Sequence, residues 1–500
     1  MMLKKWMKVI ALVVLMSQGD CAMGNTVSIP GDQYPVAIDG SGNSTQIIDP
    51  GTVTLLGGDV DVTSPTGTFL VNHPYLIIHS NLQNGLTGTF SQVVPHGFFN
   101  PELVKGVLTY DSQSGFLTMQ TTLENCADTQ NQLNVAFQLD QVINPPADLQ
   151  SALQALVALP CSEVGGTLDL LSGEQYATEM TVADMTNRQF LRRLYDPLRN
   201  IIKTPPCYNG YYNMGCCKAS IEGGSSFWVE GGGSRINIDN GHEGYGLNAN
   251  GYEIVGGIQY TFDYDWTLGL GVGYFQDNIH FKLPGHGKMH TIDFGFYGLY
   301  RPDSYYLVAD LTFGATTDKV VRTLNFGEFS TSAHGKSHIY QTTIYGEAGF
   351  DYTLLWPFFG CILAQPFLGL ELGYAHRRQI KESGAGSLDL DIGSKNFFKS
   401  YSRLGVHLNT MPEFGQMQLM LDLAWIYRFA DAGRTNSTRF AATGGTFKVQ
   451  GAPEEKGCLE AILNLTVPVG STASFYLEFV GEKWQTASAY TVLGGVQANW

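Results

Sequence analysis

Residues 266–274 read Trp-Thr-Leu-Gly-Leu-Gly-Val-Gly-Tyr, and this stretch decides the fold. Large apolar side chains fill every second position, and threonine or glycine fills the positions between them. A period of two is that of a β-strand, whose successive side chains point to opposite faces. One apolar face opposite a small or polar face is typical of a transmembrane β-barrel strand.

The same pattern recurs from about residue 225 to the end of the chain. In residues 417–429 one face is apolar, whereas the other carries Gln418, Asp422 and Arg428. About twelve such segments can be counted, and bacterial barrels require an even number. The sequence therefore predicts a mainly β protein with a C-terminal twelve-stranded antiparallel transmembrane β-barrel over residues 225–500.

The connections between these segments alternate in length, as short periplasmic turns and long external loops would. The tight connections lie at 263–265, 301–304, 356–358, 411–413 and 468–470. The longer connections lie at 238–250, 282–288, 326–336, 382–395 and 431–456. The last alternating segment runs to an aromatic residue, Trp500, at the end of the chain.

The N-terminus has the features of a secretory signal peptide over residues 1–24. Lys4, Lys5 and Lys8 precede an apolar run at 9–16, and small residues follow at 22–24. Asp20 stands immediately before Cys21, where a lipoprotein needs a small residue, so lipidation is not expected.

Two further regions separate the signal peptide from the barrel. Residues 25–145 hold short β-like runs with turn residues between them, which predicts a small β-rich domain. The spacing of the runs fits a small sandwich or the rungs of a β-solenoid, and we interpret the domain as solenoid-like. Residues 146–205 show helical spacing of leucines, and a second helical stretch covers about 172–202. Its wide polar faces fit either a linker helix on the surface or a helix threaded through a polar pore.

Composition limits the partners and the chemistry. Only 15% of residues are charged and the net charge is −16, which excludes a basic nucleic-acid-binding surface. Eight cysteines leave seven after signal removal, an odd number in an exported chain. Cys207, Cys216 and Cys217 lie in a connector at 206–224, where disulfides with one another or with another envelope protein are expected rather than a metal site.

No catalytic motif is found, so neither an enzyme activity nor a cofactor is predicted. His286 and His290, like His334 and His338, are four residues apart, but they fall in or beside predicted external loops and are expected to be solvated. Asp59 and Asp61 have no His or further acid in register and are interpreted as a surface pair.

Several segments resemble the autotransporters of type V secretion when their order is considered. The segments are residues 85–90, 108–111, 131–136, 170–177, 227–234, 251–252, 256–257 and 268–274. The resemblance implies a twelve-stranded barrel with a helix through its pore. It also implies a passenger carried to the cell surface, and a barrel inserted by the outer-membrane assembly machinery. The final strand ending at Trp500 resembles the C-terminal assembly signal of outer-membrane proteins.

Three functions follow as hypotheses. The first is an autotransporter that displays residues 25–145 on the cell surface, as an adhesin or envelope component that contacts host or envelope proteins. The second is a passive outer-membrane channel with a periplasmic N-terminal region, and the third is an enzyme-bearing passenger. The helical segment directly before the first barrel strand favours the first hypothesis. The short passenger and the many cysteines depart from the family pattern.

Overall fold

The computed structural model describes residues 27–29 and 33–500, apart from 98, 203–222, 263–264, 303, 357–359, 411–416, 431–433, 454 and 471. The predicted signal peptide and the three connector cysteines lie outside the described residues. The chain forms two compact units. The first comprises 1–125 and 140–158, and the second comprises 126–139 and 159–500.

The first unit is built from short parallel strands stacked in coils. Its strands are β1 (Val27–Ile29), β2 (Tyr34–Ala37), β3 (Ile47–Asp49), β4 (Val53–Leu55), β5 (Asp59–Thr63), β6 (Pro74–Ser80), β7 (Leu86–Thr87), β8 (Gln92–Pro95), β9 (Val104–Tyr110) and β10 (Ser114–Thr121). The parallel stacks are β1-β4-β7, β2-β5-β8 and β3-β6. Val36, Val60 and Val62 are fully buried between them. The predicted solenoid-like domain is confirmed.

Unequal coils explain why the sequence has no clean repeat. Tyr34 pairs with Val60, and Val60 pairs with Val93, so successive coils are 26 and 33 residues long. After the last coil the chain reverses, because β10 pairs antiparallel with both β6 and β9. Helix α3 (Ala147–Val157) belongs to the same unit and buries Leu149, Leu153 and Leu156.

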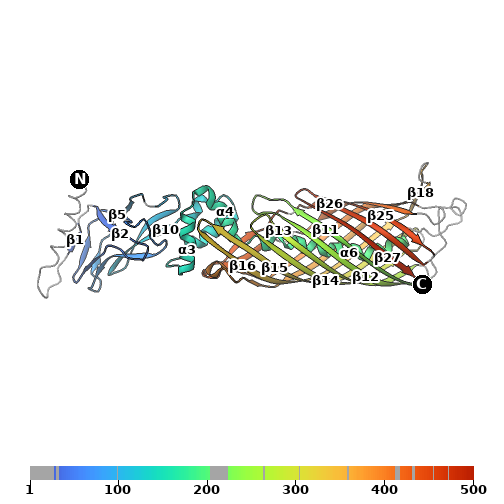
Figure 1. The fold of residues 1–500 in the computed structure, drawn as a ribbon, viewed down its shortest axis with the longest axis horizontal. Helices are drawn as coiled ribbons and strands as arrows, with labels where there is room; N and C mark the ends of the chain where they lie inside the picture. The colour runs from blue at the N-terminus through green and yellow to red at the C-terminus, as the bar shows by residue number, and fades with distance from the viewer. Residues whose placement is uncertain are drawn as a thin grey trace. The chain divides into compact units, whose positions relative to one another are not determined.

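The second unit is a closed antiparallel barrel with tilted strands (Figure 1). Its strands are β11 (Gly224–Ile238), β12 (Leu247–Phe262), β13 (Trp266–Phe281), β14 (Gly285–Tyr300), β15 (Tyr305–Phe326), β16 (Phe329–Phe350), β17 (Tyr352–Trp356), β18 (Gly360–Arg377), β21 (Lys395–Thr410), β22 (Gln418–Arg428), β25 (Gly457–Val469), β26 (Ala473–Trp484) and β27 (Ala487–Asn499). β16 and β17 pair with successive parts of β18, so they count as one strand of the barrel. Counted in this way, the described residues form twelve barrel strands. The last strand, β27, pairs with the first, β11, and closes the barrel.

The outer face of the barrel is apolar and its inner face is polar. In β13, Leu268, Leu270 and Val272 point outward and are exposed. Thr267 points into the barrel and is buried. Elsewhere inside lie buried carboxylates such as Asp293 and Glu478. This alternation confirms the predicted fold class, because a transmembrane barrel turns its apolar face to lipid.

Two segments expected to be long loops are strand instead. β14 begins at Gly285, and β16 begins at Phe329 after a turn of two residues, so the hairpin of β15 and β16 has 22 residues in each strand. The outward positions in these segments hold histidine, lysine and serine rather than apolar residues. The apolar alternation therefore stops before the strands do, which is why sequence periodicity ended them too early.

Some long connections carry a second, smaller sheet. Its strands are β19 (Ile380–Lys381), β20 (Leu390–Ile392), β23 (Thr435–Phe440) and β24 (Phe447–Gln450), in the order β19-β20-β23-β24. They come from the β18–β21 and β22–β25 connections, at the opposite end of the barrel from Trp500. This end is called the loop end below.

The helices of the second unit are α2 (Gln130–Asp140), α4 (Cys161–Ser172), α5 (Gln175–Thr178) and α6 (Met180–Ile202). Residues 131–136, expected to continue the β-rich region, are helical in α2. The expected helix at 172–202 is divided, because Gly173 ends α4 with a φ of 73° that only glycine adopts readily. Among the described residues, no helix combines the length and apolarity that crossing a bilayer requires.

Candidate functional site: the helix-filled pore

Helix α6 runs through the interior of the barrel (Figure 1). Polar side chains reach it from strands around the whole circumference. Thr343 of β16 donates to Asn187 over 2.8 Å, and Thr186 donates to Asp277 of β13 over 3.1 Å. Gln189 donates to Thr491 of β27 over 3.4 Å. A surface linker helix could not make contacts in all these directions, so the pore interpretation is confirmed.

Glycines make room for the helix on one wall of the barrel. A Cβ added at Gly271 or at Gly295 would lie 2.3 or 2.4 Å from a methyl group of Leu194. The two glycines are cross-strand partners on β13 and β14. Because any larger side chain there would collide with α6, these glycines set how closely the helix approaches the wall.

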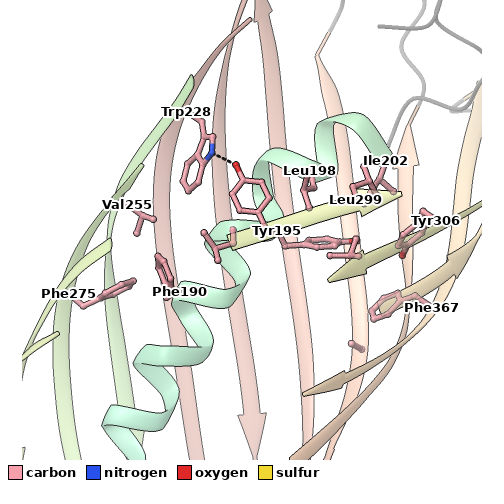
Figure 2. Close-up of a cluster of buried hydrophobic side chains, with 14 residues drawn as sticks. Phe190, Tyr195, Leu198, Ile202, Trp228, Val255, Phe275, Leu299, Tyr306 and Phe367 are labelled. Carbon is pink, nitrogen blue, oxygen red and sulfur yellow. Dashed lines mark hydrogen bonds between the residues drawn. The ribbon is translucent and has the colours of Figure 1, made fainter. Parts of the chain in front are cut away.

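An apolar cluster joins the same face of α6 to the wall. Phe190, Leu194 and Leu198 pack among buried aromatic residues of several strands, including Trp228, Phe275, Tyr297, Tyr306 and Phe367. The Trp228 indole N–H donates to the Tyr297 hydroxyl over 2.7 Å, the dashed line in Figure 2. The aromatic side chains fill the lumen at this level, and each buried polar tip has a partner.

Arginines on the opposite side of α6 pair with carboxylates of the barrel. Arg193 lies 2.9 Å from Glu253 and 3.0 Å from Glu478, and its side chain is fully buried. Arg199 lies 2.6 Å from Glu478 and 3.4 Å from Asp422. Because Glu478 is shared, the two arginines and their carboxylates form one network across β12, β22 and β26.

A second network lies one turn closer to the loop end. Arg192 is 3.0 Å from Glu460 and also contacts Glu482. Arg188 lies 3.6 Å from Glu482 and 3.7 Å from Glu371. A charge buried in this way needs an opposite charge close by, because water no longer solvates it. The arginines therefore fix the rotation and height of α6 in the lumen.

Both ends of α6 are also held by strand side chains. Near its start, Asp184 accepts a hydrogen bond from the Tyr401 hydroxyl over 2.5 Å and forms an ion pair with Lys399 over 2.5 Å. At its end, Arg301 donates to the carbonyl of Ile201 over 3.1 Å and Gln365 donates to that of Ile202 over 3.2 Å. The last carbonyls of a helix have no intrahelical donor, so these two side chains cap it.

At the loop end, α2, α4 and α5 surround the start of α6, together with the segments around Tyr245 and Gln450. These elements are called the collar below. Glu174, between α4 and α5, accepts hydrogen bonds from the backbone N–H of Tyr245 over 2.7 Å and from Asn131 of α2 over 3.3 Å. The Asn131 side chain also accepts from the N–H of Gln450 over 2.8 Å. Glu174 lies outside the membrane-spanning strands, and burial raises its pKa to about 8. A disulfide between Cys126 and Cys161 ties the start of this helical region to α4.

Comparison with known proteins decides the family. The autotransporter beta-domain family matches residues 227–480, just over half of the chain. The chain belongs to the autotransporter family. Its barrel is therefore an outer-membrane translocator barrel, which is not itself an enzyme. A search of curated proteins found no match.

Solved structures of similar barrels include other autotransporters. The translocator domain of NalP from Neisseria meningitidis is 15% identical with a TM-score of 0.49, and the alignment covers 65% of this chain and 99% of that one. The β-domain of BrkA from Bordetella is 16% identical with a TM-score of 0.41, covering 55% of this chain and 100% of that one. At these identities and TM-scores, the likenesses add nothing to the family match.

The residues singled out from sequence have different places in this autotransporter. Trp500 is exposed and pairs through its backbone with Ser225 of β11, over 3.0 Å in both directions. Cys207, Cys216 and Cys217 lie outside the described residues, and the disulfide that is described, between Cys126 and Cys161, was not predicted. No spacing signal distinguished those two cysteines from the others.

The remaining candidates are not brought together with the pore. The two histidine pairs lie on strands β14 and β16 rather than in loops. In the first unit of the autotransporter, His96 contacts Asp61, a contact that the sequence did not predict. The described residues contain no cluster of three side chains placed to hold a metal ion.

Proposed function

We propose that this barrel carries its own N-terminal β-solenoid to the cell surface and keeps it tethered there by α6. The observation that supports the proposal is the path of the chain. Within the second unit, α6 enters the lumen from the loop end and ends at Ile202, at the end of the barrel where β11 begins and Trp500 lies. An assembled barrel with this path holds the preceding segment on the side of its long connections.

The occupied lumen also argues against a passive diffusion channel. An open channel has no use for an inner helix held by buried arginine pairs, such as Arg193 with Glu253 and Glu478. Inside this barrel the polar groups serve the helix instead of a water column. We therefore favour display of the solenoid over passive diffusion.

Protease treatment of intact cells tests the display. An epitope inserted after Gly67, in an exposed turn of the solenoid, is expected to be lost when intact cells are treated. A second epitope, inserted after Gly470 in the turn between β25 and β26, is the matched control and is expected to survive. Protection of the first epitope until the outer membrane is permeabilised would contradict surface display.

The displayed solenoid is proposed to act as an adhesin or envelope component, binding host or envelope proteins. Whole cells carrying the full chain are expected to adhere to immobilised host matrix or envelope proteins. Cells carrying the chain without residues 33–125 are expected not to adhere. Equal adherence of both strains would remove this role.

Export and assembly are proposed to use the two ends of the chain. Residues 1–24 are proposed to be removed as a signal peptide, which N-terminal sequencing of the membrane protein tests. Trp500 is proposed to be read by the outer-membrane assembly machinery, and its exposed side chain is available for that contact. Deleting Trp500 is expected to lower the fraction of heat-modifiable barrel, whereas the conservative change Trp500→Phe is expected to preserve it.

A further inference from the structure

Three lysines stand side by side on the outer face of the barrel. Lys288 of β14 pairs directly with Lys319 of β15, and Lys319 pairs directly with Lys336 of β16. All three are exposed, whereas their neighbours along the strands, including Met289, Asp318 and Ser337, are buried inside. Directly opposed residues on one face of a sheet have Cβ atoms about 5 Å apart. The three ammonium groups therefore share one small area of the outer surface, called the lysine row below.

The rows above and below the lysine row are basic or neutral. On one side lie His290, Thr317 and His338, and on the other lie His286, Val321 and His334. None of the outward residues in these three rows of β14, β15 and β16 is acidic. The carboxylate of Asp318 belongs to the inner face and cannot neutralise the row.

Arg378 adds a fourth fixed charge beside the row. Its backbone N–H donates to the His338 carbonyl over 2.9 Å, and its guanidinium lies 5.4 Å from the centre of the outward Tyr340 ring. The side chain is exposed. Arg378 therefore extends the positive area to the strand next to β16.

Such a row is unfavourable for the barrel by itself. Like charges directly opposite each other on a sheet destabilise it. The whole chain carries a net charge of −16, so a cluster of four cations is not a consequence of its composition. Among the described residues, no acidic side chain forms an ion pair with Lys288, Lys319 or Lys336. The row therefore has a net positive charge that a ligand could neutralise.

The height of the row on the barrel indicates which ligand meets it. Lys288 and Tyr300 lie on the same strand, and Tyr300 stands at the opposite end, where it packs against Trp266 with ring centroids 4.4 Å apart. Twelve residues at about 3.3 Å each, tilted by roughly 40°, rise ~30 Å along the barrel axis. The apolar band of an outer-membrane barrel is about 25 Å tall.

The lysine row therefore lies just beyond the hydrocarbon layer, on the side of the loop end. Between it and Tyr300, the outward residues of β14 are apolar and exposed, among them Ile292, Phe294 and Phe296. Anionic lipid headgroups occupy this height, and clusters of Lys and Arg at a membrane surface bind them. The apolar residues below the row are placed to contact the acyl chains of the same lipid.

We propose that the lysine row, with Arg378, binds the phosphate groups of an anionic lipid in the outer leaflet of the outer membrane. Three ammonium groups in one row can contact two phosphates at once, and the flanking histidines can donate further hydrogen bonds to the phosphate oxygens. Binding fixes this side of the barrel to the leaflet. The proposal rests on the outer-membrane location and not on display of the solenoid.

The test uses the full chain folded in phosphatidylcholine nanodiscs, with lipid A, a bis-phosphorylated glycolipid, as the probe. The combined variant K288Q/K319Q/K336Q is expected to bind lipid A about 100-fold more weakly at low salt, since each lysine near a charged surface contributes about a fivefold effect. The combined variant K448Q/K456Q/K483Q removes three exposed lysines elsewhere and is expected to bind as the original chain does. Equal heat-modifiable mobility of all three proteins shows that each is folded.

Dephosphorylated lipid A separates phosphate recognition from acyl-chain binding. The original chain is expected to bind dephosphorylated lipid A about as weakly as the variant K288Q/K319Q/K336Q binds lipid A. Equal binding of both lipids by the original chain would overturn the proposal, as would full affinity of the lysine-row variant for lipid A. Lysine-dependent association between copies of the chain, unaffected by added lipid A, would also overturn it, because the row would then be a protein interface.

Discussion

The two faces of the barrel wall have opposite chemistry, although they alternate residue by residue on the same strands. Outside, Leu270 and Phe294 are exposed. Inside, Glu253 and Glu478 are buried against Arg193 of α6. The outer face needs only to be apolar, since lipid accepts any apolar shape. The inner face must match one particular helix, so each residue there is constrained by a named partner.

This difference predicts that the inner face tolerates change least. Arg193→Met keeps much of the side-chain volume but leaves Glu253 and Glu478 without their buried cation. Breaking a buried pair in this way costs about 3–5 kcal/mol. Urea unfolding of the folded barrel in micelles measures the loss. The exposed pair of Arg439 and Asp391 gives the control, because Arg439→Met should cost about 1 kcal/mol or less. Equal losses at both sites would show that the lumenal network does not hold the helix.

The outer face should respond to charge but not to size. Leu270→Arg places a cation in the hydrocarbon layer, at a cost of about 2–4 kcal/mol near the midplane. Leu270→Ala only shortens a lipid-facing side chain and is expected to assemble normally. Heat-modifiable gel mobility after membrane insertion reports both. Normal assembly of Leu270→Arg would mean that the assigned outer face is not in lipid.

The sequence predicted the outer face well and the inner face only in outline. Alternation at residues 266–274 gave the strand and its lipid-facing side, because that side needs one property alone. The arginines of α6 were recognised as polar, but the strand partners of Arg193, Glu253 and Glu478, lie 60 and 285 residues away along the chain. Which Glu meets which Arg depends on register and helix rotation, and neither is encoded locally.

The same reasoning explains two errors. Beyond the apolar band the outward residues are His286, Lys288 and Lys336, so the alternation that marks a strand disappears while the strand continues. Gly271 was interpreted only as one of the small residues between the apolar positions of 266–274, whereas Leu194 of α6 occupies the space beside it.

A larger side chain where α6 packs against the barrel wall should have an intermediate effect on stability. Gly271→Val forces a side chain against Leu194, and insertions of this size into a packed region cost about 1–3 kcal/mol. Gly346 faces outward, and a Cβ added there meets its nearest atom at 3.9 Å, so Gly346→Val is the matched control. Urea unfolding should separate the two variants. An equally stable Gly271→Val protein would place α6 farther from β13 than described.

The smallest effect is expected at the collar, and it depends on pH. Burial raises the pKa of Glu174 to about 8, so the folded collar holds a proton that the unfolded chain releases near its ordinary pKa of about 4.3. This proton stabilises the collar fully below about pH 4.3, and the contribution is lost as pH rises through 8.

Glu174→Gln should therefore remove the loss of local stability at high pH, while keeping an acceptor for the Tyr245 N–H. Amide hydrogen exchange at Tyr245 between pH 6 and pH 9, corrected for the intrinsic rate, measures it. Glu163→Gln, at an exposed position of α4, is the control. The same pH dependence in all three proteins would exclude Glu174 as its source.

The central claim is that α6 fills the pore, and single-channel conductance in planar bilayers tests it most directly. The full chain should conduct little, because Phe190, Leu194 and Arg193 occupy the lumen together with the wall residues that pack on them. The chain without residues 180–202, once shown to be folded by heat-modifiable mobility, should open a channel of clearly higher conductance. Equal conductance of the two proteins would contradict the account.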